Sequence, residues 1–178
     1  MRIIAGEHKG ARIFAPPGRD TRPTSDRVRE NVFNIVASWV EEARVLDLYA
    51  GSGAMGLEAL SRGAASAVFV EADPDAVRAI ERNLDKLRLR GATLVRLDAT
   101  AALAQEAAAG RKYDLVLVDP PYAMTDFDAL GRYLPIVLAD DGLLVLETDA
   151  RTEPELAGLE VRTTRKYGST RVTVFQQP

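Results

Sequence analysis

The chain has 178 residues, a length that suits one domain, and its 47% hydrophobic and 28% charged residues are typical of a globular rather than a disordered protein. It contains no cysteine and a single histidine, which excludes a disulfide framework, an iron–sulfur cluster and a cysteine nucleophile, and argues against a Ser-His-Asp triad or a histidine-rich metal site. No apolar run approaches the ~18 residues of a membrane span and no signal-peptide hydrophobic region is present, so we expect a soluble, cytoplasmic protein that uses no membrane and no metal.

The net charge of -3 conceals an uneven distribution along the chain. Residues 1–30 carry a net +3 and residues 161–178 a net +4, whereas residues 31–160 carry a net -10. Basic ends on an acidic body predict a surface that contacts phosphate groups. Ordinary scatter of surface charge remains the alternative interpretation.

Residues 1–40 are expected to form an extension with short elements of its own. A small β-hairpin precedes a loop that is rich in proline and glycine at residues 15–18. Thr24 or Ser25 can then cap a helix that runs to about Val40, because apolar side chains recur along one side of this segment.

From residue 41 to residue 178 the pattern predicts one main domain in which strands and helices alternate. Short apolar strands are expected at residues 44–49, 67–71, 93–97, 114–118 and 143–147. Helices are expected between them at residues 53–62, 74–90, 100–109 and 127–138. This alternation predicts a Rossmann-like, doubly wound α/β fold with a mostly parallel sheet covered by helices on both faces. The segments 161–165 and 171–175 add a C-terminal antiparallel hairpin.

The first strand of the main domain ends in a glycine-rich turn. Gly51, Gly53 and Gly56 match the pattern G-x-G-x-x-G, in which glycines let the backbone turn sharply and approach a ligand ahead of a helix. Leu57 stands where a P-loop would need lysine, so the turn is not a P-loop. The pattern alone does not separate a nicotinamide dinucleotide from S-adenosylmethionine.

Three successive strands are each associated with an acidic residue. Glu71 follows Gly51 by twenty residues and can accept hydrogen bonds from two ribose hydroxyls. Asp98 can accept from an adenine amine, although a solvated side chain is its simplest interpretation. Together with Asp47, these acids favour the cationic S-adenosylmethionine over a pyrophosphate.

The fourth strand ends in the sequence Asp119-Pro120-Pro121-Tyr122. The two prolines lack backbone N–H groups and hold the chain in a stiff, extended form. The Asp119 carboxylate and the Pro120 carbonyl are then two acceptors for an exocyclic amine, and Tyr122 offers a ring on which the base can stack. This pattern indicates transfer of a methyl group to an amino nitrogen.

Several motifs carry a resemblance to a known family. DLYAGSG, GLEALSRGA, EAD and DPPY resemble class I S-adenosylmethionine-dependent methyltransferases that act on amino nitrogens of nucleobases. MRIIAGEHKG, RPTSDRVRENVFNI and YGST, at residues 1–10, 22–35 and 167–170, narrow the resemblance to the bacterial 16S rRNA guanine-N2 methyltransferase family. The similarity runs nearly from end to end of the chain.

The resemblance implies methyl transfer from S-adenosylmethionine to the N2 amine of a guanine in 16S rRNA, within an assembly particle of the small ribosomal subunit. We expect the protein to act as a monomer and without a metal. It assigns the target amine to Asp119, Pro120, Pro121 and Tyr122. It assigns the cofactor to Asp47, Tyr49, Ala50, Gly51, Ser52, Gly53, Glu71, Asp98 and Ala99. RNA contacts are expected from the basic ends, the loop after residue 18 and the hairpin turn, at Arg2, Arg12, Arg22, Thr24, Arg27, Arg29, Arg165, Lys166, Tyr167 and Thr170.

Three other functions remain open at this point. A DNA or RNA methyltransferase of the N6-adenine type shares the DPPY motif, although a DNA enzyme would normally need a larger recognition region. An NAD-dependent oxidoreductase is supported only by the glycine pattern. A non-catalytic RNA-binding assembly factor would not need the acceptor cluster at residues 119–122.

Overall fold

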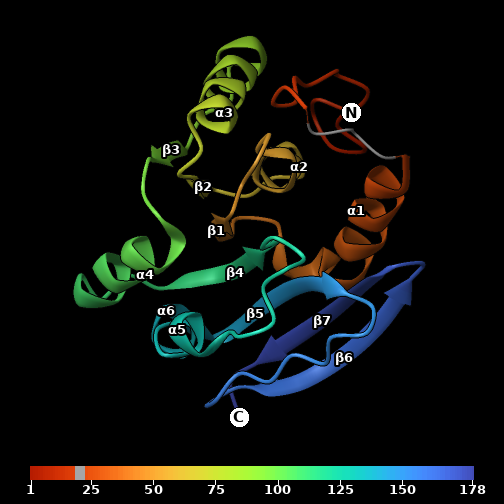
Figure 1. Cartoon of the computed structure of the whole chain (residues 1–178). Coiled ribbons are helices and arrows are strands. Elements are labelled where there is room, and N and C mark those ends of the chain that lie inside the picture. Colours follow the sequence, from red (N-terminus) through yellow and green to blue (C-terminus); the bar gives the residue numbers. More distant parts are fainter. Residues whose placement is uncertain (19–22) are drawn as a thin grey trace.

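A computed structural model describes residues 1–18 and 23–178 of the chain, with the side chains of residues 23–25 left out. Its centre is a seven-stranded sheet in the order β3-β2-β1-β4-β5-β7-β6 (Figure 1). The strands are β1 (Arg44–Leu48), β2 (Ser66–Val70), β3 (Ala92–Val95), β4 (Tyr113–Val118), β5 (Leu138–Asp149), β6 (Glu160–Tyr167) and β7 (Thr170–Gln176). β1 to β5 run parallel, and β7 pairs antiparallel with both β5 and β6.

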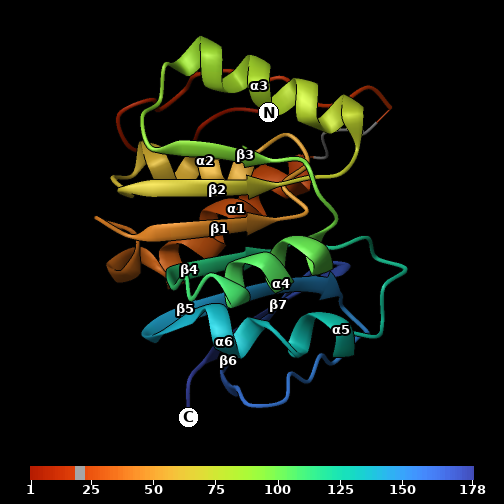
Figure 2. The ribbon, with the colours of Figure 1, turned by 90° about the vertical axis from the view of Figure 1, so that its left-hand side faces the viewer.

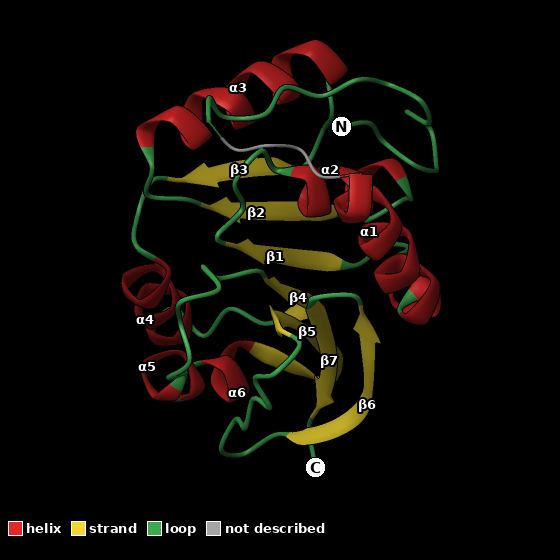
Figure 3. Ribbon diagram, turned by 45° about the vertical axis from the view of Figure 1, so that its right-hand side comes forward, coloured by secondary structure: helices red, strands yellow, loops and turns green. Residues whose placement is uncertain are grey.

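Helices cover both faces of this sheet, as the alternating pattern predicted (Figure 2 and Figure 3). The helical segments are α1 (Pro23–Ile35), the 3-10 turn η1 (Ala37–Trp39), α2 (Ala54–Ser61), α3 (Pro74–Leu87), α4 (Ala99–Ala108), α5 (Asp128–Gly131) and α6 (Leu134–Val137). One face carries α1, α2 and α3, and the other carries α4, α5 and α6. The predicted α/β class and doubly wound arrangement are therefore confirmed.

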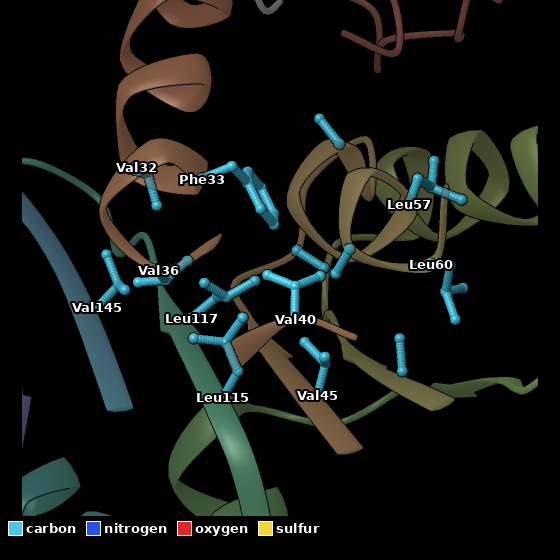
Figure 4. Close-up of a cluster of buried hydrophobic side chains, with 14 of the residues drawn as sticks. Val32, Phe33, Val36, Val40, Val45, Leu57, Leu60, Leu115, Leu117 and Val145 are labelled. Carbon is cyan, nitrogen blue, oxygen red and sulfur yellow. The ribbon is translucent and has the colours of Figure 1, made fainter. Parts of the chain in front are cut away.

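A hydrophobic core lies on each face of the sheet, and these two cores explain why the central strands are apolar on both sides. Along β4, Leu115 and Leu117 point to the core beneath α1, α2 and α3, which Figure 4 shows in close-up. Val116 and Val118 alternate with them and pack beneath α4, α5 and α6. Side chains alternate between the two faces of a strand, so a strand buried on both faces has no polar side.

Three expected elements differ in the structure. The helix expected at residues 127–138 is two single turns, α5 and α6, because Pro135 lacks the N–H that a continuous helix needs in its interior. The first helix ends at Ile35 and is followed by η1 instead of reaching Val40. The N-terminal hairpin is reduced to one antiparallel bridge between Arg2 and Arg12.

The N-terminal residues share the core of the main domain. Ile3 and Ile13 are buried in the same hydrophobic cluster as β1 and β4. The carboxylate of Glu58 on α2, itself fully buried, accepts the backbone N–H groups of Ile4 at 2.8 Å and Ala5 at 2.9 Å. The described part of residues 1–40 therefore shares the core of the main domain instead of forming a separate one.

Candidate functional site

A cavity of about 610 Å³ lies at the carboxyl ends of β1, β4 and β5. Its lining contains predicted residues from the glycine-rich turn, the Asp119–Tyr122 segment, α1 and the hairpin: Arg29, Asp47, Tyr49, Ala50, Gly51, Ser52, Glu71, Asp119, Pro120, Pro121, Tyr122 and Thr170. Ligands of open α/β sheets bind beyond the carboxyl ends of the strands. The structure thus brings most of the predicted catalytic and cofactor residues around one space.

The glycine-rich turn adopts a conformation that requires glycine at specific positions. Gly51 and Gly53 have φ angles of 59° and 79°, in the left-handed region that glycine adopts without strain. A Cβ atom on Gly56 would lie 2.4 Å from a ring carbon of Phe69, so α2 can approach β2 closely only with glycine at this position. The third glycine of the pattern therefore has a packing role.

Glu71 fixes this turn to the end of β2. One of its carboxylate oxygens accepts the N–H of Gly51 at 2.8 Å, and the other accepts the N–H groups of Ala72 and Asp73, both at 2.9 Å. The side chain is only 8% exposed and lines the cavity. Each carboxylate oxygen can accept more than one hydrogen bond, so Glu71 can hold the turn and still accept from a ligand hydroxyl.

Negative charge is concentrated along the buried side of the cavity. Asp47 is 2% exposed and accepts the N–H of Gly56 at 2.9 Å. Burial, aided by repulsion from Asp119 and Glu71 and opposed by the Gly56 hydrogen bond, raises the pKa of Asp47 to about 7. A cationic ligand would relieve this repulsion, whereas a pyrophosphate would add to it.

The Asp119–Tyr122 segment forms the opposite wall. Pro120 is buried against the protein, while Asp119 and Tyr122 are exposed at the mouth of the cavity. The Tyr122 hydroxyl lies 2.9 Å from the Thr170 hydroxyl and donates to Glu147 at 3.4 Å. These contacts anchor one end of a ring that is 42% exposed. The ring is therefore oriented and still available to stack on a planar ligand.

Glu147 lines the cavity from β5 and was not predicted from the sequence. Burial, together with repulsion from Asp119, raises the pKa of the Glu147 carboxyl above its usual range, and the hydrogen bond from Tyr122 opposes this shift. A signal was present, because Glu147 directly follows the apolar run at residues 143–146, as Asp119 follows the apolar run at residues 115–118. Met1 and Pro16 also line the cavity from the N-terminal segment, and they too were missed.

Three residues predicted to bind the cofactor do not line the cavity: Gly53, Asp98 and Ala99. Asp98 is exposed and caps α4, since its carboxylate accepts the N–H groups of Thr100 at 2.9 Å and Ala101 at 3.1 Å. Ala99 is buried in the core beneath α4. Their contact with an adenine ring remains a prediction.

Arg29 is more buried than its expected role suggests. Its side chain is 3% exposed, lies 3.1 Å from Asp26 and 3.6 Å from Glu58, and donates to the Arg2 carbonyl. Glu58 also pairs with Arg62 at 2.8 Å, so Arg29 belongs to a buried charge network. These contacts hold Arg29 at the inner edge of the cavity, which it also lines, and its contact with RNA remains a prediction.

The other predicted RNA contacts lie in two groups. Arg2, Arg12 and Arg27 are exposed at the N-terminal side, and Arg165 and Lys166 are exposed near the hairpin turn. Tyr167 is partly buried, and Thr170 is buried with its hydroxyl on Tyr122. Arg22 and the side chain of Thr24 lie outside the described residues.

Within the described residues, no helix is long and apolar enough to cross a membrane. No group of three or more His, Cys, Asp and Glu side chains in that part of the chain is placed to hold a metal ion.

Comparison with known proteins gives matches over almost the whole chain. The family described as "Conserved hypothetical protein 95" matches residues 1–176. "Putative rRNA methyltransferase YlbH" of Bacillus subtilis is 38% identical over 99% of this chain and 99% of its own length. "Ribosomal RNA small subunit methyltransferase D" of Escherichia coli is 38% identical over 84% of this chain and 75% of its own length.

Solved structures agree with these relatives. "Putative methyltransferase yhhF from Escherichia coli" is 36% identical, covers 99% of this chain and 97% of its own, and has a TM-score of 0.87. A Thermus thermophilus "16S rRNA N2 G1207 methyltransferase (RsmC) in complex with AdoMet and Guanosine" shares the fold at 22% identity and a TM-score of 0.71, over 91% of this chain and 45% of its own. The predicted family and cofactor agree with these comparisons, and the chain belongs to the conserved hypothetical protein 95 family of methyltransferases.

Proposed function

We propose that this protein transfers the methyl group of S-adenosylmethionine to the N2 amine of a guanine in 16S rRNA. The observation that carries the proposal is the pairing, in one cavity, of the Glu71-anchored glycine turn with the exposed Asp119 carboxylate and Tyr122 ring. The glycine turn can hold an adenosine-bearing cofactor, and the Asp119 carboxylate together with the Tyr122 ring can hold a nucleobase and its amine. The relative named small subunit methyltransferase D, at 38% identity, supports 16S rRNA as the substrate.

The residues of the cavity fit S-adenosylmethionine. Glu71 has acceptor capacity left for ribose hydroxyls, and the backbone at Gly51 presents no side chain that would obstruct a ligand. The buried Asp47 favours a cation over an anion at the same place. When bound, S-adenosylmethionine supplies an electrophilic methyl group on a sulfonium that leaves as a neutral thioether.

The chain's own residues bind and orient the amine. Asp119 accepts one N–H of the amine and the Pro120 carbonyl accepts the other, which directs the nitrogen lone pair at the methyl group. Tyr122 stacks on the base and fixes its plane, with its hydroxyl held by Thr170. The proton leaves the nitrogen after transfer, when that nitrogen is strongly acidic, so orientation and polarity are the main contributions of the protein.

The exposed basic residues on the N-terminal side and near the hairpin turn support an RNA substrate. Val28 on α1 and Ser169 at the hairpin turn both line the cavity, so the exposed Arg27 and the exposed Arg165–Lys166 pair belong to segments that border it. Residues 1–40 would then contact RNA around a target base that has left its stack. We infer that the substrate is a small-subunit assembly particle in the cytoplasm and that a monomer acts on it.

Base analysis of rRNA tests this proposal. Small-subunit rRNA from cells that lack the gene should be missing one N2-methylguanosine, and the purified protein with S-adenosylmethionine should restore it on particles from those cells. Restoration of N6-methyladenosine instead would favour the adenine-type enzyme. No change in any methylated nucleoside, with RNA binding retained, would favour a non-catalytic assembly factor.

A further inference from the structure

Glu147 on β5 lies beside Asp119, the residue that directly follows the neighbouring parallel strand β4. In the register of β4 and β5, Val118 pairs with Leu146, and Asp119 and Glu147 are the residues that follow this pair along the chain. Side chains at paired positions of adjacent strands point to the same face of the sheet. Both residues line the same cavity, close enough that repulsion from Asp119 contributes to the raised pKa of the Glu147 carboxyl.

Tyr122 links Glu147 to the place where a base would stack. Its hydroxyl donates to an oxygen of Glu147 at 3.4 Å, and the same hydroxyl lies 2.9 Å from Thr170. A base stacked on this ring would present its edge to the Asp119 carboxylate and to a second carboxylate close by. The proposed function uses Asp119 and leaves Glu147 without a role.

The chemistry of the amino bases gives that second carboxylate a use. The carbon that bears the amine is flanked by N1 in adenine and by N3 in cytosine, and each of these ring nitrogens has a lone pair and no hydrogen. In guanine the corresponding neighbour on one side is N1–H, which is a donor. An ionised carboxylate beside the amine would therefore repel adenine and cytosine and accept a hydrogen bond from guanine.

We propose that Glu147 selects guanine as the target base by accepting a hydrogen bond from its N1–H, while Asp119 accepts from the adjacent N2 amine. This inference rests on the proposed function, because it specifies how the same cavity distinguishes guanine from the other amino bases. Hydrogen bonds from N1–H and from the amine favour the ionised form of both carboxylates. A protonated Glu147 would instead donate to N1 of adenine, which is the outcome that contradicts the proposal.

The test compares guanine with 2-aminopurine, which keeps the amine at the same carbon and has an unprotonated N1. Small-subunit particles are reconstituted with either base at the position that the wild-type protein methylates, and single-turnover transfer rates are measured for both. Glu147→Gln removes the charge and places an amide donor near N1. Its ratio of guanine to 2-aminopurine rates should fall about 10- to 100-fold below the wild-type ratio, the scale of one hydrogen bond to a charged group. Glu155→Gln, an exposed carboxylate outside the cavity, is the matched control and should keep the wild-type ratio.

The ratio does not depend on how much of a variant is folded, because both substrates meet the same preparation. If Glu147→Gln transfers too slowly to either particle, the ratio of their dissociation constants in the presence of S-adenosylhomocysteine gives the same comparison. Glu147→Ala is a second variant for which the same loss of discrimination is expected. A wild-type ratio in both variants would overturn the role of Glu147 and leave guanine methylation intact. A wild-type product other than N2-methylguanosine would instead overturn the proposed function.

Discussion

Replacing Glu71 with glutamine should weaken cofactor binding, because the change removes a charge and also disturbs the hydrogen bonds that hold the glycine-rich turn. The two carboxylate oxygens accept N–H groups on both sides, from Gly51 on one oxygen and from Ala72 and Asp73 on the other. A glutamine amide has only one acceptor oxygen, so its NH2 group must face at least one of these backbone donors. The variant therefore loses a charge-assisted hydrogen bond and creates a contact between two donors.

The size of the effect follows from the burial of this side chain, which is 8% exposed. Hydrogen bonds to charged groups contribute about 1.5–3 kcal/mol, which corresponds to a dissociation constant about 10- to 150-fold higher. Isothermal titration calorimetry with S-adenosylhomocysteine measures this change directly. Glu81→Gln removes an exposed carboxylate that pairs with Arg96 on the surface, and it should bind like the wild type. A Glu71→Gln affinity within twofold of wild type would refute the assignment of Glu71 to the cofactor.

Three further predictions concern stability and RNA binding. Glu58→Gln removes the buried negative charge that faces both Arg29 and Arg62 and should lower the free energy of unfolding by about 3 kcal/mol in urea titrations, with an unchanged midpoint as the contradicting result. Because the pKa of Asp47 is about 7 when folded, above its unfolded value near ~3.9, the folded state holds this proton more tightly, and stability should fall as pH rises between these values. Asp47→Asn should flatten that slope, and an equally steep slope would count against the shifted pKa. Reversing the charges of Arg165 and Lys166 should weaken binding to small-subunit rRNA and reduce its salt slope by about 0.7–0.9 for each lost phosphate contact, while cofactor affinity stays unchanged; equal RNA binding would remove the hairpin from the RNA surface.

Much of the fold was predictable because the hydrophobic pattern of each segment matches its burial in the tertiary structure. The central strands are apolar on both faces, and only a sheet covered by helices on both sides buries such strands. The glycine turn and the Asp119–Tyr122 segment were also predictable, since each depends on backbone properties that the residue types themselves impose.

The differences from expectation arose where the outcome depends on contacts between distant segments. Arg29 carries a charge that predicts exposure, but Glu58 on α2 provides a buried partner that no local pattern reveals. Glu147 was missed because its position beside Asp119 follows from the β4–β5 register, which the sequence does not specify. The continuous helix expected at residues 127–138 was wrong for a local reason, because Pro135 lacks the backbone N–H that the interior of a helix requires.

The central claim is that the Asp119 carboxylate holds the amine that receives the methyl group. Single-turnover transfer to small-subunit particles from cells lacking the gene, measured for wild type, Asp119→Asn and Asp119→Ala, tests this claim most directly. Asp119→Ala should reduce the rate about 10²- to 10³-fold, and Asp119→Asn, which keeps a carbonyl acceptor, should reduce it less. Because Asp119 is exposed at the cavity mouth, thermal stability and S-adenosylhomocysteine affinity should stay near wild type in both variants. Wild-type transfer by a folded Asp119→Ala protein would contradict the account.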